Sequence, residues 1–371
     1  MDWRTSFVRG RAVSKKGEIA FRASLLAAAL STGCASSGFA AAGDPITVTI
    51  SGRMNEFFFV RDDTDDPDAP PQHQNSAGLF TYNRLTIDGR VPLGDGLTAR
   101  ASARFIANTR QPDTMDEVFV ELSSPFGRLQ LGDRQAVNAG MIESVAPQAF
   151  LHMNDEIIAS VVPPRADVQM RDGLTFKRYS RNATAIIYQS PRWNTLDIAV
   201  GYYPNGDTPV SAVRRVPTKN GTETSVSSVG SLSEAVRYRV LAGYYQSDLK
   251  FSPEKISAWN AMFDVFIGPV EIGGTVLEVA PVLGLRELNW AAGAMYFEGP
   301  WRFSVDWRQA HRRRERDNST FDKVERLTFQ TSYRIGPGIN LGGSLFQSFQ
   351  RDTLSHVWRS RGAIFGIAVG F

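Results

Sequence analysis

The stretch that decides the fold is residues 301–308, which read WRFSVDWR. Apolar side chains occupy every second position, and the positions between them carry a charge or a hydroxyl group. Successive side chains of a β-strand point to opposite faces of a sheet, so this alternation predicts a strand with one apolar and one charged face. The same period of two recurs in residues 97–105, 116–123 and 324–335.

Turn sequences separate these strands at regular intervals. The tight turns lie at 93–96, 124–127, 190–194, 268–269, 299–300 and 336–338, and longer polar stretches lie at 61–79, 135–171, 205–232, 281–287 and 312–323. Short turns at one end and long connections at the other are typical of a bacterial outer-membrane barrel. The sequence therefore predicts that the tight turns face the periplasm.

The alternating segments give fifteen strands. We expect them at residues 46–60, 80–91, 97–108, 115–123, 127–134, 182–190, 195–204, 235–246, 256–267, 270–280, 288–297, 301–311, 324–335, 339–350 and 359–371. Both termini of such a barrel face the periplasm, so the number of strands is even, and parity places a sixteenth strand within 205–232. The predicted fold is all-β, a transmembrane antiparallel β-barrel of sixteen strands.

A soluble sandwich or propeller is the alternative, because it also alternates apolar and polar side chains. Two features favour the membrane barrel. Aromatic side chains gather near the strand ends, as expected of girdles at the bilayer interface. The final segment, 362–371, alternates in the same way and ends on Phe371 without a tail.

Composition excludes several other classes. The 371 residues are 42% hydrophobic and 21% charged, contain a single cysteine, and include no apolar run long enough for a transmembrane helix. The formal charge of +3 belongs to residues 1–42, which hold six basic and two acidic residues. The remaining chain has 41 − 6 = 35 basic and 38 − 2 = 36 acidic residues, so nothing predicts a nucleic-acid partner.

Residues 1–42 read as a leader. A basic segment precedes the apolar run ASLLAAAL at 23–30, and small residues follow up to Ala42. This arrangement predicts a secretory signal peptide, with the barrel domain at 43–371. Two alternatives remain open: an amphipathic helix of the mature protein, and lipoprotein processing at Cys34.

Four segments resemble the general diffusion porins of Gram-negative bacteria, particularly the alphaproteobacterial type. They are TISGR at 49–53, NRLTIDG at 83–89, DEVFVEL at 116–122 with FGRLQLG at 126–132, and AIIYQSP at 185–191 with LDIAVGYY at 196–203. The resemblance implies a homotrimer in the outer membrane, in contact with lipids and lipopolysaccharide, that lets small hydrophilic solutes diffuse passively. It also implies that Phe371 is recognised by the barrel insertion machinery.

The resemblance further implies that a long third loop, residues 135–171, folds into the pore. Its acidic residues, Glu143, Asp155, Glu156 and Asp167, would face arginines on the barrel wall. The wall candidates are Arg84 by its motif, Arg100, Arg104, Arg128 and Arg134 by strand parity, and Arg181 before the sixth strand. Glu117 stands where some family members carry a further arginine. An alternative is that these arginines only pair with Asp88, Glu117 and Glu121.

Nothing in the sequence predicts catalysis or a cofactor. The four histidines, His73, His152, His311 and His356, are read as loop residues without a partner at catalytic or metal-binding spacing. The acidic run with Asp62, Asp63, Asp65 and Asp66 is a weak calcium candidate. The basic run 311–316 is a candidate contact for anionic lipid head groups.

Two other functions remain open. A channel selective for sugars or organic anions would be built on the same barrel. A sugar channel, however, needs a ladder of aromatic side chains on the lumen face, and most aromatic residues have the outward parity. A receptor or adhesin barrel plugged by its own loops is the second alternative. The sequence does not separate anion from cation preference.

Overall fold

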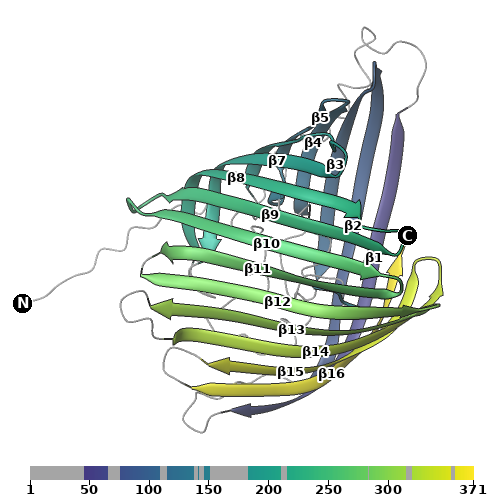
Figure 1. Cartoon of the computed structure of the whole chain (residues 1–371), viewed down its shortest axis with the longest axis vertical. Helices are drawn as coiled ribbons and strands as arrows, with labels where there is room; N and C mark the ends of the chain where they lie inside the picture. Colours follow the sequence, from purple (N-terminus) through teal and green to yellow (C-terminus); the bar gives the residue numbers. More distant parts are fainter. Residues whose placement is uncertain are drawn as a thin grey trace, which may run out of the picture.

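The computed structural model describes residues 46–65, 76–108, 115–137, 141, 146–150, 183–209, 215–282, 284–314, 320–351 and 356–371. These residues form one closed barrel of sixteen antiparallel strands, each paired with its neighbours in sequence (Figure 1). The predicted all-β barrel of sixteen strands is confirmed. In the described part of the chain, no helix is long and apolar enough to cross a membrane.

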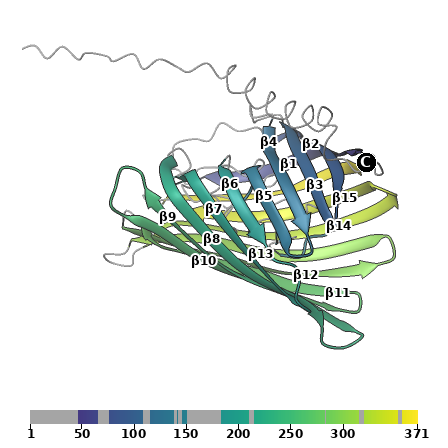
Figure 2. The same ribbon diagram turned by 90° about the horizontal axis from the view of Figure 1, so that it is seen from above.

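The strands differ in length. They are β1 (Thr47–Asp65), β2 (Ala77–Gly94), β3 (Leu97–Asn108), β4 (Met115–Ser124), β5 (Gly127–Asp133), β6 (Thr184–Gln189), β7 (Leu196–Pro209), β8 (Arg215–Ser231), β9 (Val236–Leu249), β10 (Lys255–Ile267), β11 (Val270–Val282), β12 (Leu285–Glu298), β13 (Trp301–Arg314), β14 (Thr320–Gly336), β15 (Ile339–Arg351) and β16 (Val357–Gly370). β8 is the sixteenth strand that parity placed within 205–232. Seen from above, β1–β4 lie across the barrel from β10–β13 (Figure 2).

The two faces of each strand have the predicted characters. On β13, Trp301, Phe303 and Trp307 are exposed on the outside of the barrel, whereas Asp306 and Arg308 are buried on the inside. A soluble sandwich would show the opposite pattern, because water would cover the polar face. An apolar outer wall and a charged inner wall fit a barrel surrounded by lipid.

The turns at one end of the barrel are short. Between β10 and β11 the chain reverses at Gly268, whose φ of 55° lies in the left-handed region that favours glycine. Between β14 and β15, Gly338 has a φ of 75°, and a Cβ there would collide with the backbone of Gly370. The chain enters β1 and leaves β16 at this same end, which is therefore the periplasmic end.

The barrel closes where β1 pairs with β16. The backbone N–H of Gly52 donates to Phe371 O at 2.9 Å, and the N–H of Phe371 donates to Gly52 O at 3.1 Å. The Phe371 ring covers Gly52 so closely that a Cβ at Gly52 would meet the ring. The terminal aromatic residue is thus part of the seam that closes the barrel.

Two of the predicted long loops are shorter in the structure. β11 reaches Val282 and β12 begins at Leu285, so 281–287 contains a tight reversal. Similarly, β13 and β14 extend into 312–323. Charged residues in both segments led to the prediction of loops. The alternation of side chains nevertheless continues through these segments, and their backbones pair with the neighbouring strands. A strand that extends beyond the apolar part of the outer wall can carry charged side chains on both faces.

Candidate pore constriction

The inward faces of β2–β5, together with Arg134 directly after β5, carry five of the arginines that the sequence singled out by motif or by strand parity. Arg84, Arg100, Arg104, Arg128 and Arg134 lie on this part of the inner surface, which we call the arginine wall. Successive strands bring them together because the register aligns inward positions across the sheet, for example Arg104 with Glu117. Residues far apart in sequence thereby form one charged surface.

Glu117 lies at the centre of the arginine wall. Arg104 Nη1 is 2.9 Å from Glu117 Oε1, and Arg134 forms an ion pair with the other carboxylate oxygen. The Glu117 side chain is only 1% exposed, whereas the side chains of Arg104 and Arg134 are 23% and 22% exposed. The carboxylate therefore holds both arginines in place, and Arg104 Nη1 also lies 3.7 Å from Asp116 Oδ2.

The ring of Phe119 lies against two arginines of the wall. The Arg134 guanidinium lies 4.5 Å from the centre of the Phe119 ring, and that of Arg100 lies 5.6 Å from it. These are cation–π distances. Arg100 also donates to Asp88 Oδ1 from Nε at 2.9 Å and from Nη2 at 2.7 Å. The pairing with Asp88 and Glu117 that the sequence left open is thus present for three arginines.

Within the described residues, Arg84 and Arg128 form no ion pair with a carboxylate, although the charge of Arg128 interacts with Glu121. Arg84 is directly opposite Arg53 of β1, and Arg53 Nε donates to the neutral Asn55 Oδ1 at 2.9 Å. Within the described residues, no carboxylate pairs with Arg84. Arg128 donates to the amide oxygen of Gln189 at 2.7 Å. Part of the positive charge on the wall is therefore not compensated by these neighbours.

Further round the barrel, beyond β1 and β16, residues 147–150 of the β5–β6 connection contact inward side chains of β13–β15. Gln148 Nε2 donates to Asp306 Oδ1 at 3.0 Å, and the N–H of Ala149 donates to Ser304 Oγ at 2.8 Å. Ser332 Oγ in turn donates to Ala149 O at 2.6 Å. We call Ser304, Asp306, Gln330, Ser332 and Gly342 the loop-bearing wall.

Phe150 is the last described residue of the segment that contacts the loop-bearing wall. Its N–H donates to Gln330 Oε1 at 3.2 Å, and its ring lies against Gly342, where a Cβ would collide with it. The ring also meets Phe57 edge-on, with the centres 5.7 Å apart. It belongs to a buried cluster of inward-facing residues: Phe57, Phe59, Phe80, Tyr82, Ile106, Phe346 and Ile364.

Earlier residues of the same connection contact earlier strands. The N–H of Val137 donates to Tyr203 Oη on β7 and to Glu223 Oε2 on β8, both at 3.1 Å. Ala146 packs in a buried cluster with Leu241, Met262 and Ala291, from β9, β10 and β12. The described pieces of the connection thus contact the inner surface in strand order.

Several predicted residues lie outside the described residues: Arg181, Glu143, Asp155, Glu156, Asp167 and Asp66. Two of the calcium candidates, Asp62 and Asp63, lie on opposite sides of β1, because Asp62 points outward to Arg361 and Asp63 points inward to Arg61. Among the described residues, no three His, Cys, Asp or Glu side chains form a metal-binding group. His311 lies in β13, so its assignment to a loop was wrong.

A second set of inward arginines was not assigned to the pore from the sequence. Arg308, Arg312 and Arg326 are buried on the inner faces of β13 and β14. Strand parity placed Arg308 on the polar face of its strand. Nothing in the sequence, however, indicated that the β5–β6 connection lies against the polar face of this strand.

A closed sixteen-stranded barrel with an apolar outer wall and a charged inner wall is an outer-membrane channel. The model of the Gram-negative porin family matches residues 25–353. The match covers most of the chain, so the protein belongs to the Gram-negative porin family and resides in the outer membrane. No sequence among the curated proteins matches the chain.

Solved structures share the fold at low sequence identity. The outer-membrane channel DcaP of Acinetobacter baumannii has a TM-score of 0.64 at 11% identity, covering 90% of this chain and 99% of its own. The anion-selective porin from Comamonas acidovorans has a TM-score of 0.56 at 13% identity, covering 88% and 100%. OmpT of Vibrio cholerae in its trimer form has a TM-score of 0.55 at 11% identity, covering 87% and 100%.

Proposed function

We propose that this porin is a homotrimeric general diffusion channel whose narrowest passage lies between the arginine wall and the β5–β6 connection, and that it favours small hydrophilic anions. The observation that carries the proposal is the surplus of positive charge on the arginine wall. The inward arginines of β1–β5 outnumber the carboxylates beside them: Arg53, Arg84, Arg100, Arg104, Arg128 and Arg134 against Asp88, Asp116, Glu117 and Glu121.

Fixed charge beside a narrow passage changes the local concentration of permeating ions. Glu117 and Asp88 offset part of the arginine charge, so we expect a modest anion preference rather than exclusion of cations. The contacts of residues 147–150 with the loop-bearing wall support folding of the whole connection into the lumen. Glu143, Asp155 and Glu156 would then face the arginine wall.

The outer surface supports a trimer. The exposed Trp and Tyr side chains among the described residues lie on β6–β14 or in the turn between β6 and β7: Tyr188, Trp193, Tyr202, Tyr244, Trp259, Tyr296, Trp301, Trp307 and Tyr333. β1–β5 instead present aliphatic residues such as Ile50, Leu85 and Val120. Lipid-facing walls carry aromatic girdles, so a wall without Trp or Tyr fits contact with another subunit. The similar OmpT structure is a trimer form.

A sugar-selective channel is less well supported. Inward aromatic residues do exist, at Phe57, Phe59, Phe80, Tyr82 and Phe346, although strand parity places most aromatic residues outside. They are at most 4% exposed and pack with Phe150. A channel for sugars needs aromatic rings that are exposed to the solute. Because these rings are buried, their role is to pack against Phe150 and one another. Family membership and fold likewise favour a channel over an enzyme.

Single-channel recording in planar bilayers tests the proposal. We expect large conductance steps, three equal closures for each insertion, and a reversal potential of anion-selective sign in a KCl gradient. Arg84→Gln should shift this potential toward cation preference and Glu156→Gln should shift it the other way, with both effects fading at high salt.

The matched control is Arg359→Gln, which removes the same charge from the outside of β16. It should leave the reversal potential unchanged. Absence of conductance would support the plugged receptor barrel instead. Equal shifts from Arg84→Gln and Arg359→Gln would contradict a constriction at the arginine wall.

We also propose that Phe371 contributes to recognition by the insertion machinery. Its side chain is 64% exposed at the barrel seam. Deletion of Phe371 should reduce the heat-modifiable folded form in membranes. Phe365→Ala, which removes an outward aromatic ring earlier on β16, is the control and should assemble normally.

A further inference from the structure

The ring of Phe119 occupies the middle of three inward positions on β4. Glu117 and Glu121 are the inward residues on either side of it, and alternate residues of a strand lie about 7 Å apart. The Phe119 side chain is 4% exposed, yet the buried apolar clusters of the described residues do not include it. Its surroundings on the arginine wall are therefore polar, and packing in an apolar core does not account for the ring.

Both residues directly opposite Phe119 are small. Ser102 of β3 pairs with it on one side and Gly132 of β5 on the other. Gly132 has a φ of 134°, which favours glycine, and a Cβ there would lie 2.8 Å from the Cα of Phe119. Neither neighbour has a side chain long enough to cover the ring, so longer side chains from adjacent positions can lie against it.

Two arginines occupy this space from opposite diagonals. Arg100 precedes Ser102 by two residues on β3, and Arg134 follows Gly132 by two residues after the end of β5. Their guanidinium groups lie 5.6 Å and 4.5 Å from the centre of the Phe119 ring. The two arginine side chains are still 24% and 22% exposed, so their charges remain open to the lumen.

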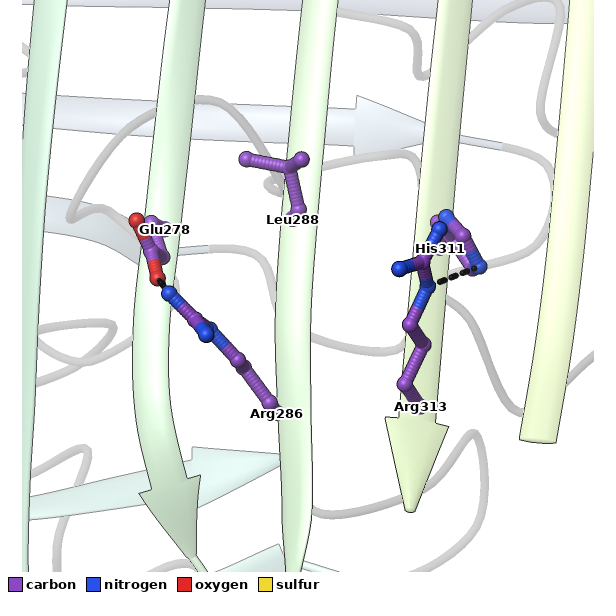
Figure 3. Close-up of a pocket in the computed structure, with 5 residues that line it drawn as sticks. All are labelled: Glu278, Arg286, Leu288, His311 and Arg313. Carbon is purple, nitrogen blue, oxygen red and sulfur yellow. Dashed lines mark hydrogen bonds and ion pairs between the residues drawn. The ribbon is translucent and has the colours of Figure 1, made fainter. Parts of the chain in front are cut away.

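A ring and a carboxylate hold an arginine with different electrostatic consequences. On the outer surface, Glu278 accepts a hydrogen bond from Arg286 Nε at 2.7 Å, and its negative charge offsets that of the guanidinium group (Figure 3). An aromatic ring attracts a guanidinium group through its quadrupole and carries no net charge. Phe119 therefore restrains its two arginines without adding negative charge to the wall.

We infer that Phe119 is a positioning residue that sets the strength of the channel's ion preference through Arg100 and Arg134. Without the ring, each guanidinium group moves further onto its carboxylate partner, Asp88 or Glu117, where its charge is cancelled more completely. Removal of the ring should then weaken anion preference although it removes no charge. The inference rests on the proposed diffusion channel, because only a conducting pore has an ion preference.

Reversal potentials in a KCl gradient test the inference with Phe119→Leu, which keeps an apolar side chain but removes the ring. We expect its chloride-to-potassium permeability ratio to fall about twofold, the factor that corresponds to a weak cation–π contact. Phe119→Tyr keeps the aromatic face and should retain the ratio of the unmodified protein. Phe119→Met, whose side chain adapts to irregular gaps, replaces the leucine variant if that variant does not assemble.

The matched control is Phe266→Leu. It removes a ring that lies 5.4 Å from the Arg237 guanidinium group at the periplasmic end of β10, away from the arginine wall, and it should leave the ratio unchanged. An unchanged ratio in Phe119→Leu, an equal fall in Phe119→Tyr, or an equal fall in the control would overturn the role of the ring. Cation preference in the unmodified channel would contradict the proposed function alone, since Phe119→Leu should still shift the ratio further toward cations.

A double-mutant cycle in denaturant unfolding tests the same contact without any current. Phe119→Leu and Arg134→Gln together should lower the unfolding midpoint by less than the sum of their separate effects, because each change removes the same contact. Additive shifts would overturn the inference whether or not the barrel conducts.

Discussion

On the arginine wall, the side chains of β2–β5 remain partly exposed and are held by one another, through Glu117, Asp88 and the Phe119 ring. On the loop-bearing wall, the inward side chains of β13–β15 are covered by residues 147–150 and are bonded to that segment. Both walls come from strands with the same alternation. What distinguishes them is whether another part of the chain covers the inward face.

This difference has an energetic consequence. Changes on the loop-bearing wall should affect both stability and the geometry of the passage, because they remove buried packing. Changes on the arginine wall should act mainly on ion preference, since solvent reaches its arginine side chains and screens part of their charge. Three substitutions test this comparison.

Phe150→Ala should have the largest effect. The side chain is 3% exposed and packs with Phe57 and Gly342, and removing a buried aromatic ring typically costs about 3–5 kcal/mol. Denaturant unfolding in detergent should show this loss, and single-channel conductance should change because the connection loses its end contact. Phe365→Ala, on the exposed outer face, is the control, and an equal loss from both variants would contradict the comparison.

Gly342→Ala should have an intermediate effect. The new Cβ meets the Phe150 ring, and overpacking of this kind costs about 1–3 kcal/mol. Gly343→Ala is the control on the outward side of the same strand, where the nearest side-chain atom is 3.2 Å from the Cβ position. The double variant with Phe150→Ala should cost less than the sum of the single variants, whereas simple additivity would mean that the two positions do not touch.

Glu117→Gln should affect stability least, by about 1–2 kcal/mol, because its two arginine partners are partly solvated. Its effect on permeation should be clear. Removing the carboxylate takes one negative charge from beside Arg104 and Arg134, leaving Arg104 with Asp116 at 3.7 Å, and should shift the reversal potential toward stronger anion preference. Glu325→Gln, which removes a carboxylate from the outside of β14, should not shift it. A shift toward cations would contradict the charge assignment of the arginine wall.

The sequence by itself determined the strand pattern. Alternation in residues such as 301–308 reports which side chains meet lipid and which meet the lumen, since that pattern depends only on the local geometry of a strand. Because both chain ends were expected on the periplasmic side, the number of strands had to be even. This requirement predicted β8 before its pairing was known. The same parity placed Arg100, Arg104, Arg128 and Arg134 on the inner surface.

Only the tertiary structure decided which inward residues meet. The contact of Phe150 with Gly342 joins positions nearly two hundred residues apart, and neither residue carries a local signal for it. The inward aromatic cluster was missed for the same reason, because its members come from β1, β2, β3, β15 and β16. Strand period fixes the face of a side chain, but closure of the barrel and the course of the β5–β6 connection fix its partners.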